Sequence, residues 1–216
     1  MLPAILFLSL FFLRCEAQVC NGVLGEPVLK VDFGAGAGRG NPVPVAETDY
    51  LYTSTYALLY KQYTIVNNTS GFYSQWFNVT DHTGNENGYM MIFNCAAVGD
   101  ILYTKRLSEI CPNTTFELSA WVLSLLNKDL LTGIDANISL SVETSSGRVL
   151  KSYNFGDIPT TNTPEWRNFS LYFTTPVDQT DIIIKIINHA EGGDGNDLAL
   201  DDITVRPCQP DLNTSF

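Results

Sequence analysis

Short segments in which apolar and polar residues alternate run along most of this chain, separated by clusters of glycine, proline, asparagine and serine. Alternation with a period of two is typical of half-buried β-strands. Strands are expected at 28–33, 89–95, 99–106, 114–126, 134–143, 149–155, 166–174, 181–188 and 197–205. Because no helical pattern is interleaved with these segments, the chain is predicted to be all-β, an antiparallel sandwich of jelly-roll size.

The last of these strands carries two adjacent carboxylates, Asp201 and Asp202. Strict alternation puts Asp201 on the same face as Ile203, and Asp202 on the opposite face. One of the two carboxylates must therefore point toward the apolar side of the sandwich. An ionised carboxylate in such a place needs a cation or several hydrogen-bond donors beside it. The strand thus raises the question of a bound metal ion.

The first 17 residues contain an apolar run, Ile5 to Leu13. The run is shorter than the roughly 20 apolar residues of a membrane-spanning helix, and it is typical of a cleaved signal peptide. We expect residues 1–17 to be that signal, residues 18–208 to form one jelly-roll domain, and residues 209–216 to be a linker or tail, with further domains of a larger surface protein possible beyond it. The location is then secreted or at the cell surface, without membrane insertion after signal removal.

Export determines how the cysteines are interpreted. Removal of the signal takes Cys15 away and leaves four cysteines, an even set that favours two disulfides in an exported chain. Three pairings are open. We favour Cys20 with Cys208, which ties the first strand to the last, and Cys95 with Cys111. A zinc site is disfavoured because the chain has no CxxC spacing.

The chain is acidic, with 12 Lys and Arg against 23 Asp and Glu and a net charge of −11 at pH 7. Nucleic acid and anionic membranes are poor partners for such a surface because both carry the same sign of charge. The charge is compatible with calcium, and solubility outside the cell explains it equally well.

Aromatic residues are concentrated between residues 50 and 77. Their rings can stack on the faces of sugars, and a tyrosine hydroxyl remains available for hydrogen bonds. We therefore regard Tyr50, Tyr52, Tyr56 and Tyr73 as candidate ligand-binding residues. The alternative is that these rings fill the sandwich core and cover its long loops, which is the more usual role of aromatic side chains.

Two stretches together resemble the opening and closing motifs of MAM-like jelly-roll domains. They are Asp81-His82-Thr83-Gly84 with Asn87-Gly88-Tyr89-Met90, and Leu198-Ala199-Leu200-Asp201-Asp202-Ile203 with Cys208. The chain resembles still more closely the N-terminal modules of bacterial gliding-motility and adhesin-type surface proteins, through Asp32-Phe33-Gly34 and the stretch from Cys111 to Trp121. Galactose-binding-like folds share the aspartate-bearing last strand.

This resemblance implies a galactose-binding-like sandwich with a structural Ca²⁺ near the first and last strands. By position it implies Asp32 and Asp201 as metal ligands, with Asp81 as a further candidate from an oxygen-rich turn. It also implies a role in adhesion or carbohydrate recognition. MAM domains pair their cysteines differently, so the resemblance does not extend to Cys20 with Cys208.

No motif frames a catalytic nucleophile, since GxSxG is absent and the two histidines, His82 and His189, lie in unrelated contexts. A pair of carboxylates about 5–10 Å apart, as in glycosidases, stays open because carboxylates are plentiful. Our first hypothesis is a non-catalytic extracellular binding or adhesion module, stabilised by calcium, that recognises carbohydrate or a cell-surface protein. The alternatives are a carbohydrate-active enzyme or its appended carbohydrate-binding module, and a structural spacer domain.

Overall fold

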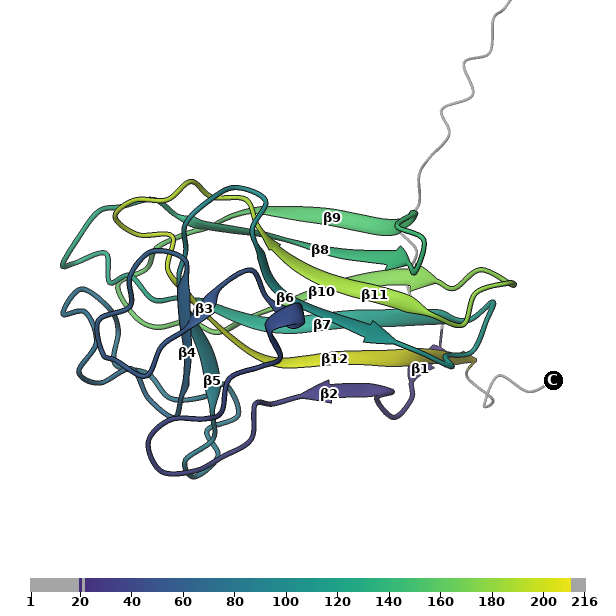
Figure 1. The fold of residues 1–216 in the computed structure, drawn as a ribbon, viewed down its shortest axis with the longest axis horizontal. Coiled ribbons are helices and arrows are strands. Elements are labelled where there is room, and N and C mark those ends of the chain that lie inside the picture. The colour runs from purple at the N-terminus through teal and green to yellow at the C-terminus, as the bar shows by residue number, and fades with distance from the viewer. Residues whose placement is uncertain (1–19, 21, 211–216) are drawn as a thin grey trace, which may run out of the picture.

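Two packed β-sheets and one short 3₁₀ turn make up the computed structural model of this chain, which describes Cys20 and residues 22–210 (Figure 1). The expected signal peptide, residues 1–17, lies outside the described residues, as does most of the expected tail. The last strand continues to Pro210, two residues past the expected end of the domain at Cys208.

The larger sheet has eight strands. Six follow the order β10-β7-β12-β5-β4-β3, and β1 and β2 also pair with β12. The strands are β1 (Gly22–Leu24), β2 (Leu29–Val31), β3 (Leu51–Tyr52), β4 (Gln62–Val66), β5 (Met90–Asn94), β7 (Thr115–Ser124), β10 (Arg167–Thr174) and β12 (Leu198–Pro210). All pairs in this sheet are antiparallel except the two-residue pairing of β3 with β4.

The smaller sheet is antiparallel and has the order β6-β11-β8-β9. Its strands are β6 (Ile101–Leu107), β8 (Ala136–Thr144), β9 (Val149–Ile158) and β11 (Ile182–Asn188), and the 3₁₀ turn η1 is Val45–Glu47. From β5 onward, consecutive strands lie in opposite sheets except for the β8–β9 hairpin. Such repeated crossing is typical of jelly-roll connectivity. The all-β, two-sheet sandwich predicted from alternation is confirmed.

All nine strands expected from the sequence are present, and β1, β3 and β4 are additional. Strand β4 lies within the aromatic region and begins directly after Lys61, whose φ of 63° reverses the chain sharply. Its residues Tyr63 and Ile65 face the core between the sheets, while Val66 packs on the opposite face. The aromatic region is therefore partly a strand rather than a continuous loop.

The apolar core lies between the sheets and includes alternate residues of β11, namely Ile182, Ile184 and Ile186. A second apolar cluster covers the outer face of the larger sheet, where the loop of residues 67–80 folds over it. It comprises Leu58, Val66, Trp76, Phe77, Val79, Met90, Ile92, Leu123, Leu125 and Ala199. Because both faces of β5 are covered, its residues 90–93 are all fully buried.

Strand β12 departs from strict alternation at its two aspartates. Leu200 and Ile203 both face the core between the sheets, so the side-chain parity changes between them. The cause is a β-bulge: the register of β12 against β7 shifts between Asp201 and Thr204, and Asp202 has a φ of 42°. A bulge inserts one extra residue and reverses the alternation beyond it. The prediction that Asp201 shares a face with Ile203 is therefore wrong, and Asp201 lies on the outer face.

Within the described part of the chain, one disulfide is present rather than the expected two. Cys20–Cys208 is formed, whereas Cys95 is a buried free thiol and Cys111 an exposed one. The register explains why the pair cannot meet. Cys95 follows the end of β5 that lies level with Ser124, and Cys111 precedes the opposite end of β7. A strand of 10 residues such as β7 spans roughly 30 Å.

Candidate functional site

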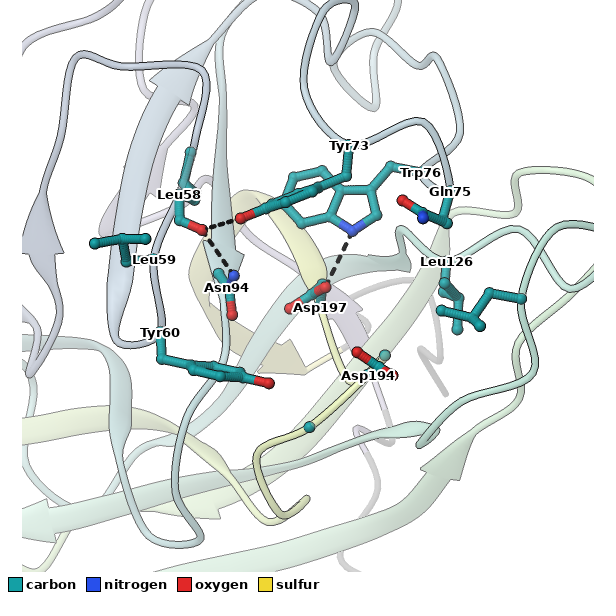
Figure 2. A pocket seen from close by; sticks show the side chains of 13 residues that line it. Leu58, Leu59, Tyr60, Tyr73, Gln75, Trp76, Asn94, Leu126, Asp194 and Asp197 are labelled. Carbon is teal, nitrogen blue, oxygen red and sulfur yellow. Dashed lines mark hydrogen bonds between the residues drawn. The ribbon is translucent and has the colours of Figure 1, made fainter.

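A cleft of about 340 Å³ opens where four loops meet beside the end of β5 (Figure 2). We call it the loop-end cleft. Its lining consists of Leu58, Leu59, Tyr60, Tyr73, Gln75, Trp76, Asn94, Leu126, Leu131, Gly193, Asp194, Gly195 and Asp197. The first three come from the loop before β4, the next three from the loop before β5, and the last four from the loop before β12. The cleft thus joins segments that are far apart in the sequence.

Two hydrogen bonds to one backbone carbonyl hold the side wall of the loop-end cleft. The hydroxyl of Tyr73 and Nδ2 of Asn94 (2.8 Å) both donate to the carbonyl oxygen of Leu58 (Figure 2). The Tyr73 ring also meets Trp76 edge-on, with 5.0 Å between centroids. The loop before β4 is therefore fastened to the loop that covers the outer face of the sheet.

Asp197 forms the floor of the cleft and is itself buried. Its Oδ2 accepts from Nε1 of Trp76 at 3.0 Å, and its Oδ1 accepts from the backbone N–H of Cys95 at 3.3 Å. Burial raises the pKa of Asp197 from 3.8 to about 7, and these two donors oppose the rise. Burial disfavours the charged carboxylate more than two donors favour it.

Asp197 should make stability depend on pH. Because its folded-state pKa is about 7 against an ordinary 3.8, the folded protein holds a proton that the unfolded chain has released between these values. Stability is therefore expected to fall as pH rises through that window, by up to about 1.4 kcal/mol per pH unit. Urea unfolding from about pH 4 to 8 should show a shallower fall for Asp197→Asn than for the wild type. The exposed Asp178→Asn is the control, and identical profiles for Asp197→Asn and the wild type would contradict the assignment.

Four tyrosines were candidates from the sequence, and one of them, Tyr73, lines the loop-end cleft. Tyr50 is buried edge-on against Phe93, and Tyr52 donates its hydroxyl to the carbonyl of Gly40. Tyr56 is exposed in a different pocket.

Sequence reasoning did not single out Tyr60, which lies in the same aromatic region and is 57% exposed in the cleft wall. The sequence signal that could have identified Tyr60 is the apolar pair directly before it, Leu58-Leu59. This pair lies outside any predicted strand. Asp194 and Asn94 were also missed, because the loop before β12 and the end of β5 meet only in the folded chain.

A second polar cluster lies where residues 81–85 meet the bulge of β12. The backbone N–H groups of His82 and Asp202 donate to the two oxygens of Asp201, at 2.9 and 2.8 Å. His82 Nδ1 lies 2.8 Å from Oδ2 of Asp202, and its ring stacks on Trp121 with 3.7 Å between centroids. Burial raises the pKa of Asp201 to about 7, and the charges of Asp202 and Asp81 add to the rise.

Asp81 is 5% exposed in this cluster. Its Oδ2 accepts from the hydroxyl of Thr83 at 2.7 Å, whereas its Oδ1 is buried without a hydrogen-bond partner. Asp32, the third metal candidate, is elsewhere: it is exposed, accepts from the N–H of Gly34 and lies 3.5 Å from Nζ of Lys30.

Over the described ranges no three side chains of His, Cys, Asp or Glu are placed to hold a metal ion. A cation at Asp81 and Asp201 would therefore take its remaining oxygen ligands from backbone carbonyls or water, as Ca²⁺ accepts.

One serine–histidine pair is present, with Nε2 of His189 2.8 Å from Oγ of Ser139. Ser139 is 2% exposed and lies in the middle of β8. Nucleophilic catalysis requires a hydroxyl that a substrate can reach, with a group that orients the base. In the described part of the chain no carboxylate forms an ion pair with His189, and Ser139 is buried away from solvent.

No protein-family model matches the chain, and no curated protein matches it in sequence. Solved structures with a similar fold include a xylan-binding domain (CBM22-1) of Paenibacillus barcinonensis, with 12% identity, 89% of this chain and 99% of that chain covered, and a TM-score of 0.42. A cyclase of Fischerella sp. TAU has 12% identity, coverage of 69% and 76%, and a TM-score of 0.49.

The CBM22-1 and GH10 modules of a Clostridium thermocellum xylanase have 18% identity and a TM-score of 0.39, with 58% of this chain but only 23% of that chain covered. All three TM-scores lie below 0.5, so these likenesses do not assign the chain to a family. The described residues contain no helix long and apolar enough to cross a bilayer.

Proposed function

We propose that the protein is a non-catalytic extracellular module that binds carbohydrate in the loop-end cleft. The observation that carries this proposal is the pairing of two accessible tyrosine rings with polar groups inside one concavity. Tyr60 is 57% and Tyr73 37% exposed, and Figure 2 shows them on either side of Asn94 and Asp197. Aromatic faces beside a few fixed polar groups are typical of small-ligand sites, and such faces suit the apolar side of a sugar ring.

The polar groups of the cleft match the hydroxyls of a sugar. Oδ1 of Asn94 is buried and has no hydrogen-bond partner among the described residues. The side chain of Asp194 is on the exposed loop before β12 and also lines the cleft. Both are acceptors for hydroxyl donors, and a donor at Asn94 would remove the cost of an unpaired buried acceptor.

Three features support display outside the cell. Cys20–Cys208 is a bond of the kind that persists in oxidising compartments. The apolar run at the start of the chain is typical of a secretory signal, and the sequence resembles modules of surface proteins. Adhesion through a cell-surface protein, with further domains of a larger chain, is the corresponding alternative mode of action.

We further propose that bound Ca²⁺ stabilises the folded protein and takes no part in a reaction. Asp81 and Asp201 approach each other on the outer face of the larger sheet, and Oδ1 of Asp81 lacks a partner. Bound Ca²⁺ would neutralise charge that is costly to bury there. Asp32 has no part in this site because its contacts are to Gly34 and Lys30.

The carbohydrate proposal predicts that Tyr60→Ala weakens glycan binding by about tenfold, since a stacked ring face is lost. A glycan array with residues 18–216 identifies the ligand, and calorimetry measures its affinity for the wild type and the variant. Tyr153→Ala is the matched control, because Tyr153 is 56% exposed on the smaller sheet and should leave affinity unchanged. A blank array with folded wild-type protein would overturn the proposal, as would equal affinity in Tyr60→Ala.

A further inference from the structure

A second pocket, of about 230 Å³, is lined in part by the loop of residues 67–80 that also lines the loop-end cleft. The two pockets share this loop: Phe72 lines the second and Trp76 the first, and their rings stack with centroids 6.1 Å apart. Arg39, from the glycine-rich segment before η1, enters this second pocket, which we call the Arg39 pocket.

The guanidinium of Arg39 packs against two aromatic rings that also contact each other, Tyr56 and Phe72, whose centroids are 5.2 Å apart. Its Cζ lies 4.7 Å from the ring centroid of Tyr56 and 5.0 Å from that of Phe72. Nη1 donates to the hydroxyl of Thr64 at 2.9 Å, whereas Nη2 is buried and has no hydrogen-bond partner. Leaving a buried donor of a charged group without a hydrogen bond costs free energy. The Nη2 of Arg39 therefore favours binding of an acceptor from outside the chain.

The charge of Arg39 is also unmatched, although acidic residues outnumber basic ones in this protein by 23 to 12. No carboxylate of the described residues lies within 4.0 Å of its guanidinium. Six other cations do have a carboxylate partner, namely Lys30, Lys61, Lys105, Arg106, Arg167 and Lys185. Among the described residues Lys128, Arg148, Lys151 and Arg206 likewise have no carboxylate partner, so what distinguishes Arg39 is that its Nη2 is buried and unpaired at the wall of a pocket.

The surroundings of Arg39 suit an anion carried on a sugar. Tyr56 lies against the guanidinium and is 61% exposed, so its side chain is free to rotate, and a ligand would reach the buried Nη2 by such a movement. The exposed Ser70 and Asn87 also line the pocket. Among the residues described, neither the hydroxyl of Ser70 nor Nδ2 of Asn87 forms a hydrogen bond, so both are available to sugar hydroxyls.

We propose that the Arg39 pocket binds the carboxylate of an acidic sugar of the uronic acid class. The carboxylate pairs with the guanidinium, the sugar ring packs against Tyr56, and its hydroxyls reach Ser70 and Asn87. The inference rests on the proposed carbohydrate function and deepens it, because it makes the Arg39 pocket the part of the surface that selects for charge.

The test is a calorimetric titration with a galacturonic acid trimer, a galactose trimer and sodium acetate. The wild type should bind the acidic trimer more tightly than the neutral one, and Arg39→Gln should weaken only the acidic trimer, by about tenfold or more. Raising NaCl from about 0.05 to about 0.5 M should weaken the acidic trimer further. Arg148→Gln, in the exposed β8–β9 turn, is the matched control and should bind like the wild type.

Thermal unfolding shows whether each variant is folded. If Arg39→Gln does not fold, Tyr56→Ala replaces it, since that exposed side chain should cost affinity for the acidic trimer and not for acetate. Acetate binding as tightly as the trimer would overturn the sugar assignment.

Equal affinity for both trimers in the wild type, or an unchanged acidic affinity in Arg39→Gln, would sink the inference and leave the proposed function standing. Binding of neither trimer, together with a blank array, would remove the proposed function as well. An affinity for the acidic trimer that falls in Arg39→Gln, while the affinity for the neutral trimer stays at the wild-type value, would support the inference.

Discussion

Replacing both Cys20 and Cys208 by serine is expected to lower the free energy of unfolding by about 5 kcal/mol. The bridge joins residues 188 positions apart, so in the loop-entropy account it restricts the unfolded chain strongly. The folded state depends on it as well. The N-terminal segment is held to β12 by two ladders of three residues each and by the guanidinium of Arg206, which donates to the carbonyls of Leu24 and Gly25.

Urea unfolding of the double variant, compared with the wild type with and without reductant, measures this effect. Reduced wild type should approach the double variant, and Cys111→Ser should match the oxidised wild type because Cys111 is an exposed free thiol. Thiol titration adds a direct check: Cys111 should react in the native protein and Cys95 only after unfolding. An unchanged urea midpoint in the double variant would contradict the expectation.

Calcium is expected to raise the melting temperature of the wild type by roughly 5–10 °C at concentrations near 100 times its dissociation constant. Such saturation adds about 2.7 kcal/mol to the folded state if the unfolded chain does not bind the ion. Asp81→Asn and Asp201→Asn should lose this gain, since each removes one of the two carboxylates proposed to bind the ion, Asp201 on β12 and Asp81 in the loop before β5.

Asp32→Asn is the control for the calcium experiment. The sequence resemblance names Asp32 as a ligand, whereas in the structure its side chain is exposed beside Lys30. Melting curves with calcium, with magnesium and with chelator should therefore be the same for Asp32→Asn and the wild type. Calcium stabilisation that survives in both Asp81→Asn and Asp201→Asn would exclude this site.

The sequence predicted the strands well because their signal is local. Nine segments with alternating or continuous apolar patterns became β2 and β5 to β12, since an apolar strand face must be buried whatever its neighbours are. The short strands β1 and β3, of three and two residues, carry too little pattern to be recognised. Position also favoured the Cys20–Cys208 pair, one of three pairings that the sequence left open, and the structure shows that it forms.

The candidate site was predicted only in outline. The aromatic region contains Tyr60 and Tyr73 of the loop-end cleft, yet the same composition gives a core residue, Tyr50. Composition alone does not say which aromatic ring is buried, because the residues that bury it belong to segments distant in sequence. Arg39 gave no signal at all, since a missing ion-pair partner is visible only in the folded chain.

By itself, then, the sequence determined the all-β class, the main strands and the acidic charge, because each depends on local pattern or on counting. The tertiary structure alone decided the rest. The bulge at Asp202 moved Asp201 to the outer face, the register of β7 kept Cys95 from Cys111, and the loop of residues 67–80 made two pockets. Each of these results depends on contacts between distant segments, and a one-residue shift in strand pairing reverses which side chains are buried.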